Sequence, residues 1–218
     1  NSSDPLFDRG AGPVVIDPST PTTVYAVGGG GVVKSTDAGA NWTFCPGSTN
    51  FIHVLAIDPA APSHLFAGGY ISGVMRSLDG CASWESANTG ITDTYIQAIV
   101  VAPGAPSTVY LAGDFEGISR SDDAGASWTS INSNLPVPTL GIPRILEVDT
   151  QAPATVYASI GEGMYKTTDG GGSWSPISTG LPEPSDFRAI AIDPVHPNRL
   201  FVGSEGFFSE GFVYGTGN

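Results

Sequence analysis

Short apolar runs alternate with polar turns along the chain, and the order of the runs repeats five times. Each unit opens with an apolar run, passes through a turn that contains proline, forms a second apolar run and reaches a glycine turn before a third. Runs of this length between Gly, Pro, Asp and Ser are typical of β-strands. No stretch keeps the helical period. The opening runs are 14–18, 54–59, 98–103, 145–149 and 189–194.

Four of the five units carry the same eight-residue phrase at the end of the third run, and its last residue is a Trp that begins a fourth run. We call each copy a box. The boxes recur about every 44 residues, and a fixed period of this size indicates a repeat architecture. Four short antiparallel strands in such a repeat predict the blade of a β-propeller. The boxes span 35–42, 77–84, 121–128 and 167–174.

We therefore predict an all-β fold: one β-propeller domain of four-stranded antiparallel blades, with four full blades and a partial fifth. Two arrangements stay open. Residues 1–12 could supply a strand that closes a five-bladed ring, or the chain could be an arc of a larger ring, which we favour because those residues show little strand character. An open arc would expose blade faces and could self-associate. The predicted blades span approximately 13–50, 51–93, 94–141, 142–186 and 187–218.

The boxes resemble the Asp box, Ser/Thr-x-Asp-x-Gly-x-Thr/Ser-Trp, of sialidases, sortilin-type receptors, xyloglucan-active glycoside hydrolases and photosystem II assembly factors. The resemblance covers roughly residues 13–203 and implies the propeller fold, while the proteins that share it have unrelated activities. Within a box, the Asp can accept backbone N–H bonds in a tight turn, and the Trp can bury a large surface between strands. These framework residues are Asp37, Asp79, Asp123, Asp169, Trp42, Trp84, Trp128 and Trp174.

Two further features accompany the boxes. A basic residue precedes each one, so we assign half of the eight bases to the framework. In the second box Cys81 stands where the others have Gly, and we expect a distorted turn. A disulfide between Cys45 and Cys81 would need Cα atoms within about 7 Å; we expect separate thiols, with pairing as the alternative. The basic residues are Lys34, Arg76, Arg120 and Lys166.

Composition narrows the class of partner. The formal net charge is −13, from 21 acids and 8 bases, which disfavours nucleic acid and anionic membrane surfaces. No apolar run reaches the roughly 18 residues of a membrane span. We predict no cofactor and no metal, because the three His are not at metal-ligand spacing. Low Lys, high Gly, Ser and Thr and the resemblance favour an extracellular or periplasmic protein, either processed or part of a longer chain.

The connections of a propeller alternate between two faces. The boxes and the turns between first and second strands share one face, where the loops are short and repetitive. The links between blades and the turns between second and third strands share the other, which we call the variable face. Loops of unequal length on a rigid scaffold commonly carry binding sites. The acids of this face include Asp93, Asp114, Glu116, Glu162, Glu183, Asp186 and Glu205.

One register of the variable face places polar side chains near the propeller axis, at the start of each innermost strand. These residues could bind a ligand, with the arginines as forks for a carboxylate or hydroxyl, or they could simply be solvated at the mouth of the channel. Tyr70, Asp114 and Glu116 join them from the inner turns. The residues of this register are His53, Gln97, Arg144 and Arg188, with Gly12 in the first unit.

The sequence thus predicts a secreted, non-catalytic module that binds a glycan or a protein on the variable face. Two alternatives stay open, a part of a larger glycoside hydrolase and a purely structural module of a surface protein. A glycosidase needs two carboxylates about 5–9 Å apart, one of them protonated. A sialidase-like site needs three arginines and a Tyr, and only Arg144 and Arg188 are plausible. We expect the candidate carboxylates to form a solvated acidic rim, with a catalytic pair as the alternative; they are Asp114, Glu116, Glu162 and Glu205.

Overall fold

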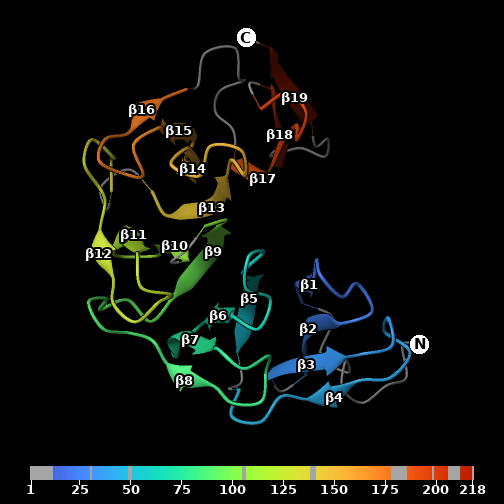
Figure 1. The fold of residues 1–218 in the computed structure, drawn as a ribbon. Coiled ribbons are helices and arrows are strands. Elements are labelled where there is room, and N and C mark those ends of the chain that lie inside the picture. Colours follow the sequence, from blue (N-terminus) through green and yellow to red (C-terminus); the bar gives the residue numbers. More distant parts are fainter. Residues whose placement is uncertain are drawn as a thin grey trace.

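The computed structural model describes residues 12–29, 31–48, 51–104, 107–137, 141–177, 186–197, 199–205 and 212–217. In these ranges every regular element is a β-strand, arranged in four four-stranded antiparallel sheets and a fifth of three strands (Figure 1). The prediction of an all-β propeller with four full blades and a partial fifth is confirmed. The strands are, in blade one, β1 (Val14–Ile16), β2 (Val24–Gly28), β3 (Gly31–Ser35) and β4 (Thr43–Phe44); in blade two, β5 (Ile52–Ile57), β6 (Leu65–Gly69), β7 (Gly73–Ser77) and β8 (Glu85–Ser86); in blade three, β9 (Ile96–Ala102), β10 (Thr108–Gly113), β11 (Gly117–Ser121) and β12 (Thr129–Ser130); in blade four, β13 (Pro143–Val148), β14 (Val156–Ile160), β15 (Gly163–Thr167) and β16 (Ser175–Pro176); and in blade five, β17 (Asp186–Ile192), β18 (Arg199–Glu205) and β19 (Phe212–Gly217).

The blades follow one another along an arc, with the first strands on its inner side and the short fourth strands at the rim (Figure 1). The first strands of consecutive blades, β5, β9, β13 and β17, lie side by side. Since side chains alternate along a strand, β5, β9 and β13 each present apolar residues to the blade before and to the blade after. This alternation places the core between blades.

Each interface between blades is a separate apolar cluster. Between blades two and three, for example, Ile99 and Val101 of β9 pack against Phe66 of β6 and Val74 of β7. Burying one such side chain contributes about 1.5–3 kcal/mol. The second strand supplies an aromatic residue to the following interface in the first four blades, and all four are almost fully buried: Tyr25, Phe66, Tyr110 and Tyr157.

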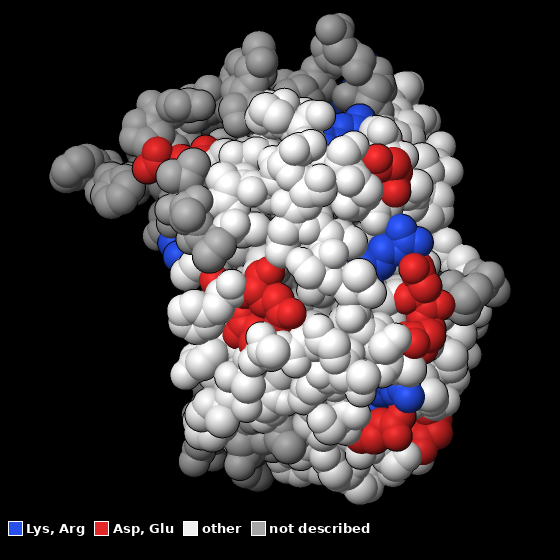
Figure 2. Space-filling model, turned by 90° about the vertical axis from the view of Figure 1, so that its left-hand side faces the viewer, with Lys and Arg blue, Asp and Glu red and all other residues white. Residues whose placement is uncertain are grey.

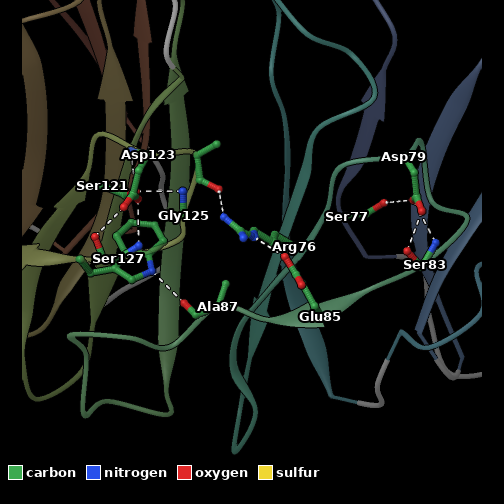
Figure 3. A network of polar contacts seen from close by, with 12 residues as sticks. Arg76, Ser77, Asp79, Ser83, Glu85, Ala87, Ser121, Asp123, Gly125 and Ser127 are labelled. Atoms are coloured by element: carbon green, nitrogen blue, oxygen red, sulfur yellow. Dashed lines mark hydrogen bonds and ion pairs between the residues drawn. The ribbon is translucent and has the colours of Figure 1, made fainter.

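The basic residues that precede the boxes bridge consecutive blades. Each of the first three donates a hydrogen bond to a backbone carbonyl in the box turn of the next blade, and Figure 3 shows the bond from Arg76. Lys166 lies 5.2 Å from the centroid of the Tyr157 ring. The bonds run from Lys34 Nζ to Gly80 at 2.9 Å, from Arg76 Nη1 to Ala124 at 2.8 Å and from Arg120 Nη1 to Gly170 at 3.0 Å.

The box turns are closed by their own side chains (Figure 3). In the third box, Ser121 Oγ donates to Asp123 Oδ1 at 2.7 Å and accepts the backbone N–H of Gly125 at 2.8 Å. Ser127 donates its N–H to Asp123 Oδ1 at 2.8 Å and its hydroxyl to Oδ2 at 2.6 Å. These donors, the Ser127 hydroxyl first, lower the pKa of Asp123 to about 2. The same arrangement gives Asp37, Asp79 and Asp169 pKa values of about 2.

The second box corrects two expectations from the sequence. Its turn is not distorted, because Cys81 adopts a φ of 81°, in the left-handed region where Gly39 and Gly125 lie in their boxes. Cys81 also donates its N–H to Ser77 Oγ at 2.9 Å, as Gly125 does to Ser121. The cysteines are not separate thiols but form a disulfide between blades one and two, with Cα atoms 5.4 Å apart.

The four Trp side chains are not buried alike. Trp128 and Trp174 are 5% and 2% exposed, and their Nε1 atoms donate to carbonyls of the preceding blade, those of Ala87 and Ile131. Trp42, by contrast, is half-buried and donates to Gly39 within its own box. Trp84 is half-buried as well. The two Trp side chains that donate to the preceding blade are thus the two that are fully buried.

Candidate functional site

The four polar residues of the predicted register all lie at β-bulges. In each of blades two to five, the pairing of the first strand with the second skips one residue at its start, and the skipped residue is the polar one. A bulge bends a strand and redirects a side chain. The sequence register is thus a structural register as well, and it comprises His53 on β5, Gln97 on β9, Arg144 on β13 and Arg188 on β17.

In blades two and three the structure brings several predicted residues together. The His53 ring stacks on Tyr70, with centroids 4.3 Å apart. Gln97 donates from Nε2 to Asp114 Oδ1 at 2.5 Å. Burial lowers the pKa of His53, which favours the neutral ring. Both of its nitrogens are buried.

A row of exposed aromatic side chains continues from this pair across the variable face. Tyr70 contacts Tyr95 edge to face at 5.8 Å, and Tyr95 contacts Phe115 in the same way at 6.2 Å. Their exposed fractions are 44%, 37% and 73%. They come from the β6–β7 turn, the β8–β9 link and the β10–β11 turn. We call Tyr70, Tyr95 and Phe115 the aromatic row.

Two carboxylates hold the loops that carry Tyr95 and Phe115. Asp93 is buried; its Oδ1 accepts the N–H of Tyr95 at 2.9 Å, and its Oδ2 accepts those of Phe115 at 2.6 Å and Glu116 at 3.2 Å. Glu116 Oε2 in turn accepts the N–H groups of Thr92 at 2.9 Å and Asp93 at 3.1 Å. The carboxylate of Glu116, predicted to face a ligand, is therefore occupied with backbone amides.

On the side of the molecule that lies to the left in Figure 1, the charges fall into two groups (Figure 2). Along one edge acidic residues alternate with basic ones (Figure 2). Two ion pairs of the described residues are Arg76–Glu85 and Arg120–Asp122. Elsewhere on the same side a compact acidic cluster contains no base (Figure 2). A surface of this composition repels anionic ligands.

The remaining predicted residues belong to other blades. Arg144 and Arg188 are exposed at the bulges of blades four and five, and Glu162 is exposed in the β14–β15 turn. The side chain of Glu205 and the predicted acid Glu183 lie outside the described residues. Within the described ranges, no group of three His, Cys, Asp or Glu side chains is arranged to hold a metal ion. No helix there is long and apolar enough to cross a membrane.

A surface hollow of about 480 Å³ lies away from the variable face, between the outer edges of blades three and four. Arg120, Asp122 and Gly170 line it, and all three already take part in framework contacts. We therefore assign the hollow to the framework.

Sequence reasoning missed Tyr95 and the structural role of Asp93. Tyr95 stands alone in the 85–96 link, and nothing in its neighbours along the chain places it beside Tyr70. Asp93 was grouped with the acids of the variable face. Only the fold brings the link and the β10–β11 turn together. The sequence offers one indication of this contact, which is that Tyr95 and Phe115 lie in separate loops of the same predicted face.

Comparison with known proteins identifies the fold. No family model matches the chain, and no curated protein matches it. Among solved structures, the GH74 xyloglucanase from Xanthomonas campestris is similar with a TM-score of 0.73 and 19% identity, over 93% of this chain and 36% of that one. YCF48 bound to D1 peptide matches with a TM-score of 0.63 and 19% identity, over 84% and 58%. The extracellular domain of a one-component system from B. thetaiotaomicron matches with a TM-score of 0.70 and 14% identity, over 94% and 29%.

These similarities show the propeller fold, as the resemblance of the boxes implied. The chain spans 30–36% of the length of three GH74 structures that it matches. Identity below 25% carries no residue roles across, and one fold serves many activities. The function therefore has to be argued from the site.

Proposed function

We propose that this chain is a non-catalytic binding module that holds a neutral glycan on the variable face of blades two and three. The observation that carries the proposal is the aromatic row, which is exposed to solvent and held by the buried carboxylate of Asp93. Single exposed aromatic residues are common on protein surfaces, but exposed aromatic residues in mutual contact are typical of binding surfaces.

The chemistry beside the row favours a sugar. The C–H groups on one side of a pyranose ring form an apolar face that packs against an aromatic ring, and its hydroxyls need hydrogen-bonding partners at the edge. Gln97 and Asp114 lie at the edge of the row and offer donors and acceptors. The net charge of −13 disfavours an anionic glycan. A neutral glycan chain satisfies both conditions.

A screen of soluble neutral polysaccharides by affinity gel electrophoresis tests the proposal, with xyloglucan as the first probe. We expect retardation in at least one, with a dissociation constant between about 10 µM and 1 mM, because a shallow site loses much of its interaction energy to desolvation and ordering. The double variant Arg144→Ala, Arg188→Ala shows whether the glycan reaches blades four and five. Binding to a peptide in place of every glycan would overturn the glycan assignment.

A secreted location accompanies this proposal. The Cys45–Cys81 disulfide is typical of oxidising compartments. One of the similar structures is an extracellular domain. We therefore place the module outside the cytoplasm, and oxidation of both cysteines in protein isolated from its natural source would test this.

A role within a larger glycoside hydrolase is the second candidate, because the chain covers about a third of the GH74 structures. Catalysis would need a pair of carboxylates at glycosidase separation. Asp93 and Glu116 hold backbone amides, and Asp114 accepts a hydrogen bond from Gln97. We expect no release of reducing sugar from xyloglucan by this chain; measurable hydrolysis would favour the second candidate.

A further inference from the structure

We propose that Asp93 and Glu116 are positioning residues that fix the aromatic row in its binding geometry. Glu116 does so by accepting hydrogen bonds from backbone amides, and its negative charge is not required. The inference rests on the proposed function, since the row is taken as the glycan surface. It assigns Glu116 a different role from the ligand-binding carboxylate that the sequence predicts. It also adds Asp93, which contacts no ligand in this scheme.

The two loops are joined by more than these carboxylates. Tyr95 accepts the backbone N–H of Asp114 through its carbonyl at 3.1 Å, and Thr94 accepts that of Gly73 at 3.3 Å. The β8–β9 link is thus tied to the inner turns of both blades that carry the row. Tyr70 follows β6 in one of these turns and Phe115 follows β10 in the other. The link that carries Tyr95 therefore sets the spacing of the three rings.

The two carboxylates use their oxygens differently. Asp93 uses both: Oδ1 accepts from Tyr95, and Oδ2 accepts from Phe115 and Glu116. Asn in its place must turn an NH₂ group toward at least one of these N–H donors, whichever way the amide is flipped. Glu116 receives both of its backbone bonds through Oε2 alone. Gln can therefore replace Glu116 without losing an acceptor.

Close packing adds a third constraint. A Cβ atom on Gly113, at the end of β10, would lie 2.6 Å from Asp93 Oδ2. This separation is too short for a carbon beside a carboxylate oxygen, so Gly113→Ala would push Asp93 away from its amides. The glycine leaves room for the carboxylate in the same way that small residues elsewhere admit a close backbone approach.

The test compares four variants: Asp93→Asn, Gly113→Ala, Glu116→Ala and Glu116→Gln. Hydrogen exchange reports the loops without a ligand: the Tyr95 and Phe115 amides report the bonds to Asp93, and the Thr92 and Asp93 amides report those to Glu116. Near-UV circular dichroism reports the packing of the rings. We expect exchange at least about tenfold faster at the Tyr95 and Phe115 amides in Asp93→Asn and Gly113→Ala, because Asp93 is their acceptor. In Glu116→Ala we expect the same at the Thr92 and Asp93 amides, which donate to Glu116. All three variants should give a weaker near-UV signal. Glu116→Gln should match the wild type in both measurements.

Glycan affinity supplies the second arm. We expect it to fall about tenfold in the first three variants, because the row must be ordered on binding, and to stay unchanged in Glu116→Gln. Wild-type exchange in Asp93→Asn, or a loss of affinity in Glu116→Gln with wild-type exchange, would overturn the positioning role. If the variants show the expected exchange pattern but the wild-type protein binds no glycan, the proposed function is wrong. The positioning role then stands for the loops alone, without an effect on glycan binding.

Discussion

The box face and the variable face are both held by carboxylates that accept hydrogen bonds from backbone amides. On the box face these bonds are local in the sequence, whereas on the variable face they join separate loops. Asp123 closes its own eight-residue turn, and Asp37, Asp79 and Asp169 do the same in their blades. Asp93 joins two loops that lie about 20 residues apart in the chain and occurs once. Contacts that recur in register build a scaffold, whereas a contact made once shapes one place on it. The comparison leads us to expect that stability and binding can be changed separately.

The interface between blades one and two breaks the repetition of the scaffold. Between blades two and three and between blades three and four, the Trp of the later blade donates to a carbonyl three residues after the preceding Trp, that of Ala87 or Ile131. Cys45 holds this position in blade one, and its carbonyl instead accepts bonds from Ser48. Trp84 Nε1 is buried without a partner among the described residues. The side chain of Cys45 supplies a covalent link to blade two in place of that hydrogen bond.

Removal of the disulfide should have the largest effect on stability. The double variant Cys45→Ala, Cys81→Ala should lose about 2–4 kcal/mol, because the unfolded chain is no longer constrained. Cys45→Ala with Cys81→Gly should recover about 1 kcal/mol of this, since residue 81 has a φ of 81° that glycine adopts without strain. Chemical denaturation of the three proteins measures both differences. Unchanged stability of the first variant would show that the disulfide does not support the interface.

Loss of the bridge from Arg76 should come next. Arg76→Ala removes a charged hydrogen bond to Ala124 and should cost about 1–3 kcal/mol. The ion pair of Arg76 with the exposed Glu85 adds little. Glu85→Ala is therefore the matched control, expected to lie within about 0.5 kcal/mol of the wild type. Equal losses in the two variants would mean that the ion pair, and not the bridge, supports this interface.

Substitution of Trp84 and of Trp128 should give a smaller difference in the free energy of unfolding. Trp128→Phe removes the bond to Ala87 and should cost about 1–2 kcal/mol. Trp84→Phe removes a buried donor that has no partner in the described structure, so we expect a clearly smaller loss from the same change. Denaturation midpoints of the two variants give the comparison. An equal or larger loss for Trp84→Phe would contradict the account of the first interface.

Acid should weaken the scaffold within a defined range. The box aspartates have pKa values of about 2 in the folded protein, below the ordinary value of 3.8. Because the folded pKa is lowered, their contribution is present above about pH 4 and is lost as the pH falls toward 2. Unfolding free energies measured from pH 7 to pH 2 should decline below about pH 4. The decline should be less steep in Asp123→Asn. An identical slope in that variant would contradict the assignment.

The scaffold was predictable from the sequence because its contacts are local or repeated. Four copies of the box reveal the period, and within each copy Asp and Ser lie close enough in sequence to bond each other. The register of His53, Gln97, Arg144 and Arg188 followed from the same period and coincides with the bulges. The Cys45–Cys81 disulfide and the hydrogen bonds that Asp93 accepts from two loops depend on distances between blades and loops. A pattern along one chain does not contain those distances.

The separation of scaffold from binding surface is tested most directly by one pair of variants in one titration. Tyr70→Ala with Tyr95→Ala removes two rings of the row, and Arg76→Ala weakens the scaffold between the same blades. Isothermal titration with a xyloglucan oligosaccharide, beside a thermal melt of each protein, gives affinity and stability together. The account predicts that the double Tyr variant loses at least about tenfold in affinity with little change in melting temperature. It predicts a lower melting temperature and wild-type affinity for Arg76→Ala, and wild-type affinity in the double Tyr variant would contradict it.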